Sequence, residues 1–179
     1  FGYFEGFPID TSVTPPLNPD LGASADAANN WNCLGWEIYP TGKKQIIEFY
    51  TDKYPGIPQV VTENGTDNDA SRPGWVVDMI DQMGEAMAEG HNVKGYLHWS
   101  LMDNFEWERG YGQHFGLVRV EFDNVNKATN RSITEGGQVF ADIIANGGVT
   151  AGMREQYGTV GNPDNIKDNT AACSDQGAE

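Results

Sequence analysis

The sequence contains few cysteines and few histidines. Cys33 and Cys173 are its two cysteines and lie far apart, which argues against a disulfide framework or a cysteine-based metal cluster. We therefore expect a reduced chain in the cytoplasm. The histidines His91, His98 and His114 are not spaced as metal ligands, so we expect no metal and no other cofactor.

Basic residues and long hydrophobic runs are also scarce. Eleven Lys and Arg stand against 26 Asp and Glu, which gives a formal net charge of -15. Such a surface repels nucleic acid and anionic membranes, so we expect neither as a partner. No apolar run approaches the roughly 20 residues that cross a membrane as a helix. The 179 residues suffice for one domain with a sizeable core.

Helices and strands are expected to alternate along the chain. Short β-branched runs bounded by turn residues predict two buried strands, at 57–62 and 93–99. The helices that we expect begin at Thr41, Trp75 and Ser132 and end near Tyr54, Glu89 and Ala145. Ser132 and Glu135 match a capping box at the start of the last helix, and Gly147 suits its C-terminal cap.

The remaining segments read as irregular structure. Residues 8–30 are rich in Pro, Asp and Asn and predict a long loop, and 115–122 predicts an extended arm. Residues 151–179 predict a C-terminal tail, loosely held over its last part. Strands that alternate with helices favour an α/β fold with a parallel sheet. Because two buried parallel strands cannot stand alone, polypeptide outside this chain must supply their neighbours.

Two places along the chain suggest carbohydrate chemistry. Glu63 follows the first strand, where α/β proteins place catalytic groups, although a Glu can also begin a solvated turn there. The loop after the second strand combines aromatic and polar side chains, namely Trp99, Asp103, Asn104, Glu106 and Trp107. Trp rings pack on sugar faces and carboxylates bind sugar hydroxyls, so this loop predicts a sugar cradle. The plainer interpretation is that both Trp residues belong to a core.

Three motifs resemble family 1 glycoside hydrolases. VTENG at 61–65 is similar to the nucleophile motif of that family, and 95–122 is similar to its segment from strand 8 through the sugar-binding loop. GWEIYPTG at 35–42 resembles the lead into its helix 6, and the likeness runs from Trp36 to Gly147. The form YLHWSL looks like archaeal members. The resemblance implies the C-terminal portion of a (β/α)8 TIM barrel, with strands 7 and 8, which is incomplete alone.

The resemblance also implies an activity and site residues. The activity would be retaining hydrolysis of terminal non-reducing β-D-glucosyl residues, or of β-D-galactosyl or fucosyl residues. Glu63 would be the catalytic nucleophile. Glu106 would bind the sugar hydroxyls O4 and O6, and Trp107 would contact O3. Trp99 would form the floor of the sugar site, and Phe115 would line the same pocket.

The second catalytic carboxyl group of the family is missing from this sequence. In the family it lies in an Asn-Glu-Pro motif near strand 4, and no such motif occurs here. We therefore expect a complementary N-terminal segment of the same enzyme as partner, and no activity from this chain alone. Three residues depart from the family pattern at the outer pocket, namely Glu108, Arg109 and His114. These departures concern the aglycone more than the chemistry.

Two other functions compete with this interpretation. A 6-phospho-β-glycosidase would carry a Ser and a Lys–Tyr pair in the sugar loop, whereas Glu106 and residues 112–116 provide no such group. A carboxylate facing a phosphate is unfavourable. The other alternative is a catalytically dead sugar-binding relative or scaffold. The presence of Glu63 together with Glu106 and Trp107 argues against it.

Overall fold

The structure is a computed structural model that describes residues 32–34, 36, 38–123, 125 and 127–166. The expected loop at 8–30 and residues 167–179 of the expected tail lie outside the described residues. The elements are α1 (Thr41–Lys53), β1 (Gln59–Val61), α2 (Arg72–Ala88), β2 (Val93–Tyr96), η3 (Trp107–Arg109), β3 (Val118–Phe122), β4 (Ala128–Ile133), α3 (Glu135–Asn146), α4 (Ala151–Tyr157) and η4 (Pro163–Asn165).

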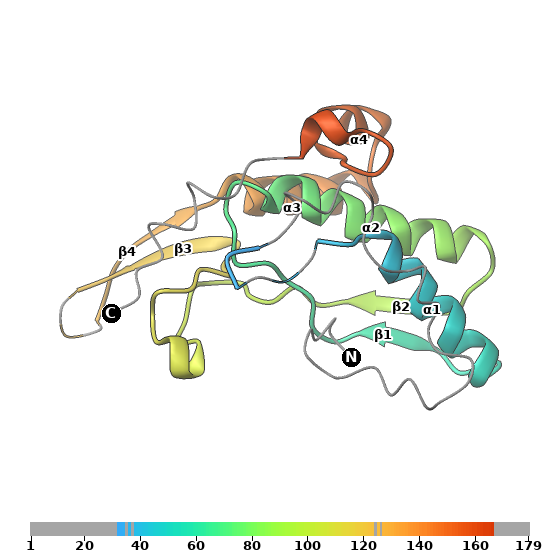
Figure 1. Ribbon diagram of the computed structural model, residues 1–179, viewed down its shortest axis with the longest axis horizontal. Coiled ribbons are helices and arrows are strands. Elements are labelled where there is room, and N and C mark those ends of the chain that lie inside the picture. Colours follow the sequence, from blue (N-terminus) through green and yellow to red (C-terminus); the bar gives the residue numbers. More distant parts are fainter. Residues whose placement is uncertain (1–31, 35, 37, 124, 126, 167–179) are drawn as a thin grey trace.

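The strands β1 and β2 pair in parallel, as the alternation of elements predicts. The helices α1 and α2 lie along one side of this pair (Figure 1). On β1 the side chains alternate accordingly, because Val61 is buried whereas its neighbour Val60 is 48% exposed. Among the described residues the sheet does not close into a barrel. One apolar face of the pair is therefore covered by helices and the other is open.

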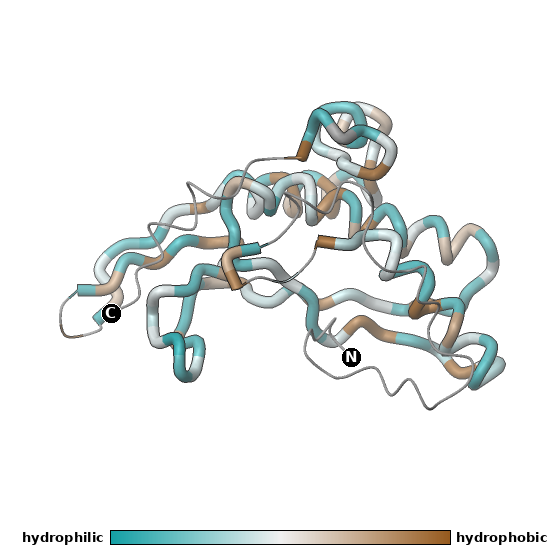
Figure 2. The backbone as a smooth tube through the Cα atoms, in the orientation of Figure 1, coloured by the Kyte–Doolittle hydropathy of each residue, from teal (hydrophilic) through white to brown (hydrophobic). Residues whose placement is uncertain are grey.

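The core lies between α2 and α3. Its buried residues are Ile38, Trp75, Val76, Val77, Met79, Val139 and Ile143. Figure 2 shows apolar residues on β1 and α3, whereas the loop that carries η3 is mostly hydrophilic. No described helix combines the length and the apolar character needed to cross a membrane. The core thus anchors α2, whose N-terminal end carries the loop that follows Glu63.

An antiparallel hairpin replaces part of the expected last helix. β3 and β4 pair from Val118↔Ile133 onward and project away from the helices (Figure 1). The expected arm at 115–122 is thus confirmed as a strand, but its partner β4 was not foreseen. Ser132 lies in β4, so the capping box is wrong. Thr134 caps α3 instead, since its hydroxyl accepts from the Gly137 amide at 3.0 Å.

The end of α3 and the residues after it are more ordered than expected. Gly147 adopts a left-handed conformation, with φ of 71°, as the C-cap prediction requires. Residues 151–166 of the expected tail form α4 and η4. Arg154 on α4 bonds to Asp81 on α2 through two contacts of 2.6 and 2.5 Å. The ion pair between Arg154 and Asp81 thus holds α4 against α2, and the first part of the expected tail is helical.

Cys33 is disulfide-bonded. The expectation that the cysteines are reduced is therefore wrong for this residue. The expectation rested on the spacing of the cysteines along the chain, and that spacing does not determine which cysteines meet in space. Cys173 lies outside the described residues.

Candidate active site

Glu63 lies two residues beyond β1, at the carboxyl end of the parallel strand pair. Hydrogen bonds hold its neighbour Asn64 against the end of β2. The Asn64 carbonyl accepts from the Trp99 amide at 2.9 Å, and the Tyr96 hydroxyl lies 3.3 Å from the Asn64 side-chain oxygen. Because Asn64 is buried, these bonds fix the chain on the C-terminal side of Glu63. The structure thus brings Glu63 and Trp99 to the same sheet edge.

Gly65 allows this close approach. A Cβ atom at position 65 would lie 1.7 Å from the Trp99 carbonyl oxygen. No real side chain could occupy that space without displacing the backbone that carries Trp99. The glycine of the ENG motif is therefore required because two strand-end loops touch there.

Trp99 and Glu106 form the polar part of the candidate sugar cradle. The indole nitrogen of Trp99 donates to Glu106 Oε1 at 3.0 Å. Burial raises the pKa of Glu106, bonds from Trp99 and Asn104 lower it, and the charge of Glu63 raises it again, with a net upward shift. The charge of Glu63 thus acts on Glu106, which is consistent with two carboxylates that face one space.

Trp107 lies at the turn that displays the cradle. Its φ of 52° is left-handed, a conformation that is uncommon for a large side chain. The turn is closed by the Glu106 amide, which donates to the Gly110 carbonyl at 2.7 Å. The indole of Trp107 is 77% exposed. A strained backbone that displays an exposed Trp is typical of a binding site.

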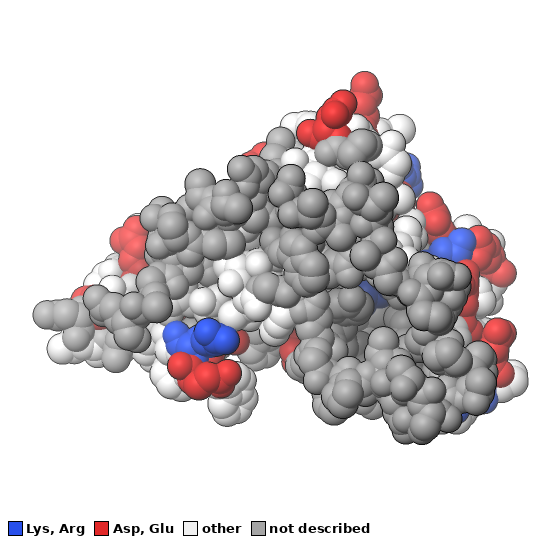
Figure 3. All heavy atoms as spheres, viewed as in Figure 1, with Lys and Arg blue, Asp and Glu red and all other residues white. Residues whose placement is uncertain are grey.

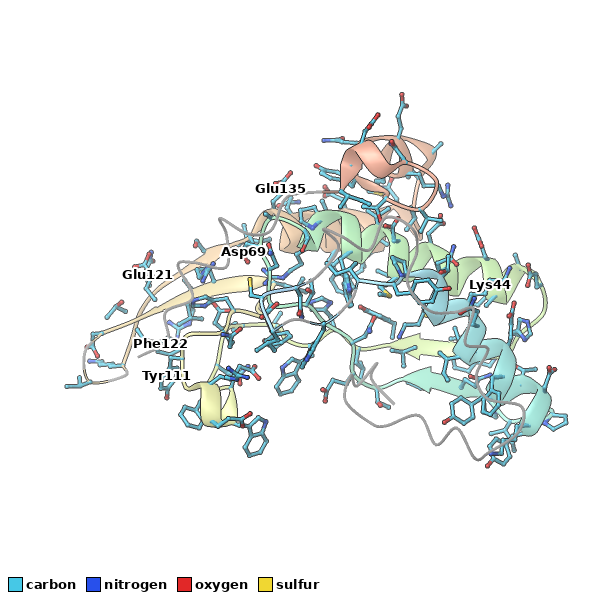
Figure 4. All side chains as sticks on the ribbon, in the orientation of Figure 1. Lys44, Asp69, Tyr111, Glu121, Phe122 and Glu135 are labelled. Carbon is cyan, nitrogen blue, oxygen red and sulfur yellow. The ribbon has the colours of Figure 1, made fainter. Side chains whose placement is uncertain are left out.

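Aromatic contacts fasten this turn to the hairpin. The Tyr111 ring lies 4.3 Å from the Phe122 ring of β3, and 5.4 Å from the Phe105 ring, measured between centroids (Figure 4). These ring pairs stabilise the loop on the side opposite to β2. The backbone around Trp107 is therefore held from two directions.

Phe115 is buried and bonds to the residue that follows Trp99. Its ring centroid lies 6.1 Å from that of Trp36, and its carbonyl accepts from the Ser100 amide at 3.1 Å. The peptide between Trp99 and Ser100 is cis. Phe115 thus supports the strand end that carries Trp99. Its contact with a bound sugar stays a prediction.

Asp103 does not belong to the cradle, although the sequence grouped it with Glu106. Its side chain is buried and accepts backbone bonds from Gly116 at 2.8 Å and from Val120 at 3.1 Å. The buried Arg72 was missed altogether, although it donates to the Gly116 carbonyl at 2.9 Å. A charged residue in a polar loop looks solvent-exposed in a sequence, so no pattern indicated these buried roles.

The arrangement is that of an α/β unit with carboxylates and aromatic rings at the carboxyl ends of parallel strands, which is where such folds carry enzymatic sites. The model of glycosyl hydrolase family 1 matches residues 13–149. The chain therefore belongs to glycosyl hydrolase family 1.

Archaeal relatives are prominent among similar proteins, in agreement with the sequence motifs. A β-galactosidase of Pyrococcus woesei is 38% identical over 126 residues, which cover 69% of this chain and 24% of that protein. A β-galactosidase of Sulfolobus acidocaldarius is 44% identical over 91 residues, which cover 50% of this chain and 18% of that protein. This chain thus spans about a quarter or less of the length of these relatives.

Solved structures agree with the family assignment. The β-glycosidase from Thermosphaera aggregans is 38% identical with a TM-score of 0.66, and the match covers 75% of this chain and 27% of that one. A family 1 β-glucosidase from Thermotoga maritima is 30% identical with a TM-score of 0.62, covering 69% of this chain and 30% of that one. The strand pair and its helices therefore correspond to a part of a TIM-barrel enzyme.

Proposed function

We propose that this chain is the nucleophile-bearing part of a retaining β-glycosidase. Its substrates would be terminal non-reducing β-D-glucosyl, galactosyl or fucosyl residues. The observation that carries the proposal is the placement of Glu63 at a strand end beside the bonded pair Trp99 and Glu106. Relatives named as β-galactosidase, β-glucosidase A and β-D-glucosidase/β-D-fucosidase support the substrate class.

The chemistry requires two carboxyl groups. The Glu63 carboxylate attacks the anomeric carbon, and the bond to the leaving oxygen breaks as a second carboxylic acid protonates that oxygen. The same group then takes a proton from water, which attacks the glycosyl ester and releases Glu63. Retention needs the two carboxyl groups about 5–5.5 Å apart. The second group belongs to the complementary N-terminal segment, so the isolated chain should be inactive.

The cradle would recognise the sugar hydroxyls. Glu106 is held by Trp99, so its carboxylate can accept bonds from O4 and O6 in a fixed direction. Trp107 is exposed and able to reach O3, while Trp99 offers an apolar floor. The Phe115 carbonyl holds the backbone next to Trp99 through its bond with the Ser100 amide. A neutral sugar also suits the net charge of -15, and Figure 3 shows separate acidic groups among the described residues of one face, with a few basic groups beside them.

The competing functions make different demands. A 6-phospho sugar would place a phosphate against the Glu106 carboxylate, which is electrostatically unfavourable. A sugar-binding scaffold would need the cradle but no nucleophile at Glu63. The complementary segment and the cytoplasmic location stay predictions.

The proposal is tested in an assembled enzyme, defined as the 179-residue chain together with a complementary polypeptide. The complement is the part of the Pyrococcus woesei β-galactosidase that this chain does not match. We expect the assembly, and neither part alone, to hydrolyse 4-nitrophenyl β-D-glucoside or galactoside, with the β-anomer formed first in a proton NMR time course. Sugar binding without hydrolysis would favour the scaffold, and an α-anomer formed first would exclude retention.

A further inference from the structure

Asp103 joins the two ends of the loop that carries the candidate sugar ligands. We call residues 103–116 the sugar loop. At its end, Gly116 donates its amide to Asp103 Oδ1 at 2.8 Å, and His114 Nδ1 lies 3.0 Å from Asp103 Oδ2. The Val120 amide donates to Oδ2 at 3.1 Å, and the Asp103 amide donates to the Val118 carbonyl at 3.1 Å. One carboxylate therefore closes the base of the sugar loop.

The closure leaves no room for another arrangement. The Asp103 side chain is 1% exposed, so water cannot replace its partners. A Cβ atom at position 116 would lie 2.4 Å from the Asp103 amide nitrogen and 2.7 Å from Oδ1. Only glycine fits at position 116 because the carboxylate contacts the backbone there. Asp103 and Gly116 are thus matched to each other.

Arg72 connects this base to the loop that follows Glu63. Its guanidinium is fully buried and donates to the Gly116 carbonyl at 2.9 Å and to the Thr66 carbonyl at 3.2 and 3.3 Å. Arg72 is the first residue of α2, and it also pairs with Asp69 in the loop that leads into this helix. One side chain therefore spans the loops after β1 and β2. The guanidinium of Arg72 is planar and rigid, so it fixes the distance between these two loops.

A second charged path links the same loops. Asp69 pairs with Arg119 of β3, and Arg119 Nε lies 3.8 Å from Asp103 Oδ2. Burial raises the pKa of Asp103, but bonds from His114, Val120 and Gly116 outweigh it, so the net shift is downward. The groups that face Asp103 are thus donors or cations. An ionised carboxylate is the form that satisfies all of them.

We propose that Asp103 is a positioning residue, which together with Arg72 holds Glu106 and Trp107 at a fixed distance from Glu63. This inference rests on the proposed function, because the held residues are its sugar ligands and nucleophile. Asp103 itself does not touch the sugar. Its loss should therefore act chiefly through Glu106, with a smaller part through Trp107, rather than add a separate defect.

The test is a double-mutant cycle on the assembled enzyme. Asp103→Asn keeps the shape of the side chain but replaces one acceptor oxygen with an NH2 group. This donor would face the backbone N–H of Val120 or Gly116, so the sugar loop should shift. We expect kcat/KM on 4-nitrophenyl β-D-glucoside to fall roughly a hundredfold, which is the cost of about 1 Å of misplacement. In a Glu106→Gln background the same change should cost less than roughly threefold. Equal losses in both backgrounds would overturn the positioning role.

A matched control uses another buried carboxylate. Asp78 on α2 accepts from the Thr159 amide at 2.9 Å and from its hydroxyl at 2.5 Å, so the partner that it binds follows α4 and does not belong to the sugar loop. Asp78→Asn should lower the unfolding temperature but show no coupling with Glu106→Gln. Coupling of similar size at both sites would mean that general loosening explains the effect, and the proposal would fail.

A readout that needs no activity separates this inference from the proposed function. Arg109 is exposed within the sugar loop, and Arg154 is exposed on α4. Under native conditions, Asp103→Asn should speed trypsin cleavage after Arg109, and Asp78→Asn should speed it after Arg154. Unchanged cleavage after Arg109 in Asp103→Asn would contradict the inference even if the wild-type assembly is active. Faster cleavage there would support the loop closure even if hydrolysis is never observed.

Discussion

The indole N–H of Trp99 donates to Oε1 of Glu106 over 3.0 Å. Trp99 lies three residues beyond β2, and Glu106 precedes the η3 turn, so the bond ties the segment at the end of the strand to the loop. A side chain that only packed on sugar would need no such bond. The bond indicates that Trp99 orients the carboxylate, in addition to the role as floor of the sugar site that we propose for it.

Replacing Trp99 by Phe should separate these two roles. The aromatic face remains, but Glu106 loses its donor, and hydrogen bonds to charged groups contribute about 1.5–3 kcal/mol. We expect kcat/KM of the assembled enzyme to fall roughly tenfold or more. Because the Trp99 bond lowers the pKa of Glu106, its loss should raise that pKa further. Glu106 would then be protonated, and substrate binding would weaken, at a higher pH than in the wild type. A pH series of kcat/KM would show this shift on its acidic limb.

Gly65→Ala should disrupt the site through the backbone. The added methyl group would lie 1.7 Å from the Trp99 carbonyl oxygen, so the two loops must separate. Overpacking of this kind costs at least about 1–3 kcal/mol, and activity should be lost with it. Gly84→Ala is the control. Gly84 lies on α2, and a Cβ atom at this position would meet no neighbouring atom within 4 Å. Thermal unfolding should show stabilisation of about 0.5–1 kcal/mol for that variant.

Lys43 should make stability depend on alkaline pH. Its side chain is 5% exposed beside a cavity of about 290 Å³ between α1 and β1, and burial lowers its pKa to about 8. The folded pKa is below the unfolded value of 10.5, so folding disfavours the charged form. The free-energy cost of burying the charged amine is about 3 kcal/mol at its largest, and it is fully present below pH 8. It disappears as the pH rises from 8 toward 10.5.

Lys43→Met removes this charge. We expect the variant to unfold at a higher urea concentration at pH 7 and to lose the rise in stability between pH 8 and 10. Lys94→Met, at an exposed position on β2, should keep the wild-type pH dependence. An identical pH dependence in wild type and Lys43→Met would show that the amine does not carry the cost.

The edge of the sheet that we propose as the active site could be located from the sequence because its signals are local. Glu63 directly follows a β-branched run, and the loop from Trp99 to Trp107 concentrates aromatic and acidic residues within a few positions. Both features survive in the structure. The parallel pairing of β1 and β2 follows from the alternation of strands and helices in the same way.

Long-range pairing was not readable in this way. Ser132 and Thr134 are both suitable caps, and only the pairing of Ser132 with Arg119 in the hairpin decides between them. Asp103 looked like a sugar ligand until its bonds with Gly116 showed it facing inward. The disulfide at Cys33 was likewise not indicated by any local pattern. Each wrong expectation concerns residues that other segments separate along the chain. The composition of those segments does not determine whether the residues meet in space.

The central claim is that Glu63 forms the covalent bond to the sugar. The direct measurement is mass spectrometry of the assembled enzyme after reaction with 2,4-dinitrophenyl 2-deoxy-2-fluoro-β-D-glucoside, followed by peptide mapping. We predict one fluoroglucosyl adduct, located on Glu63 and absent from Glu63→Gln. An adduct on Glu106 or another residue, or no adduct in an assembly that hydrolyses the nitrophenyl glycoside, would contradict the account.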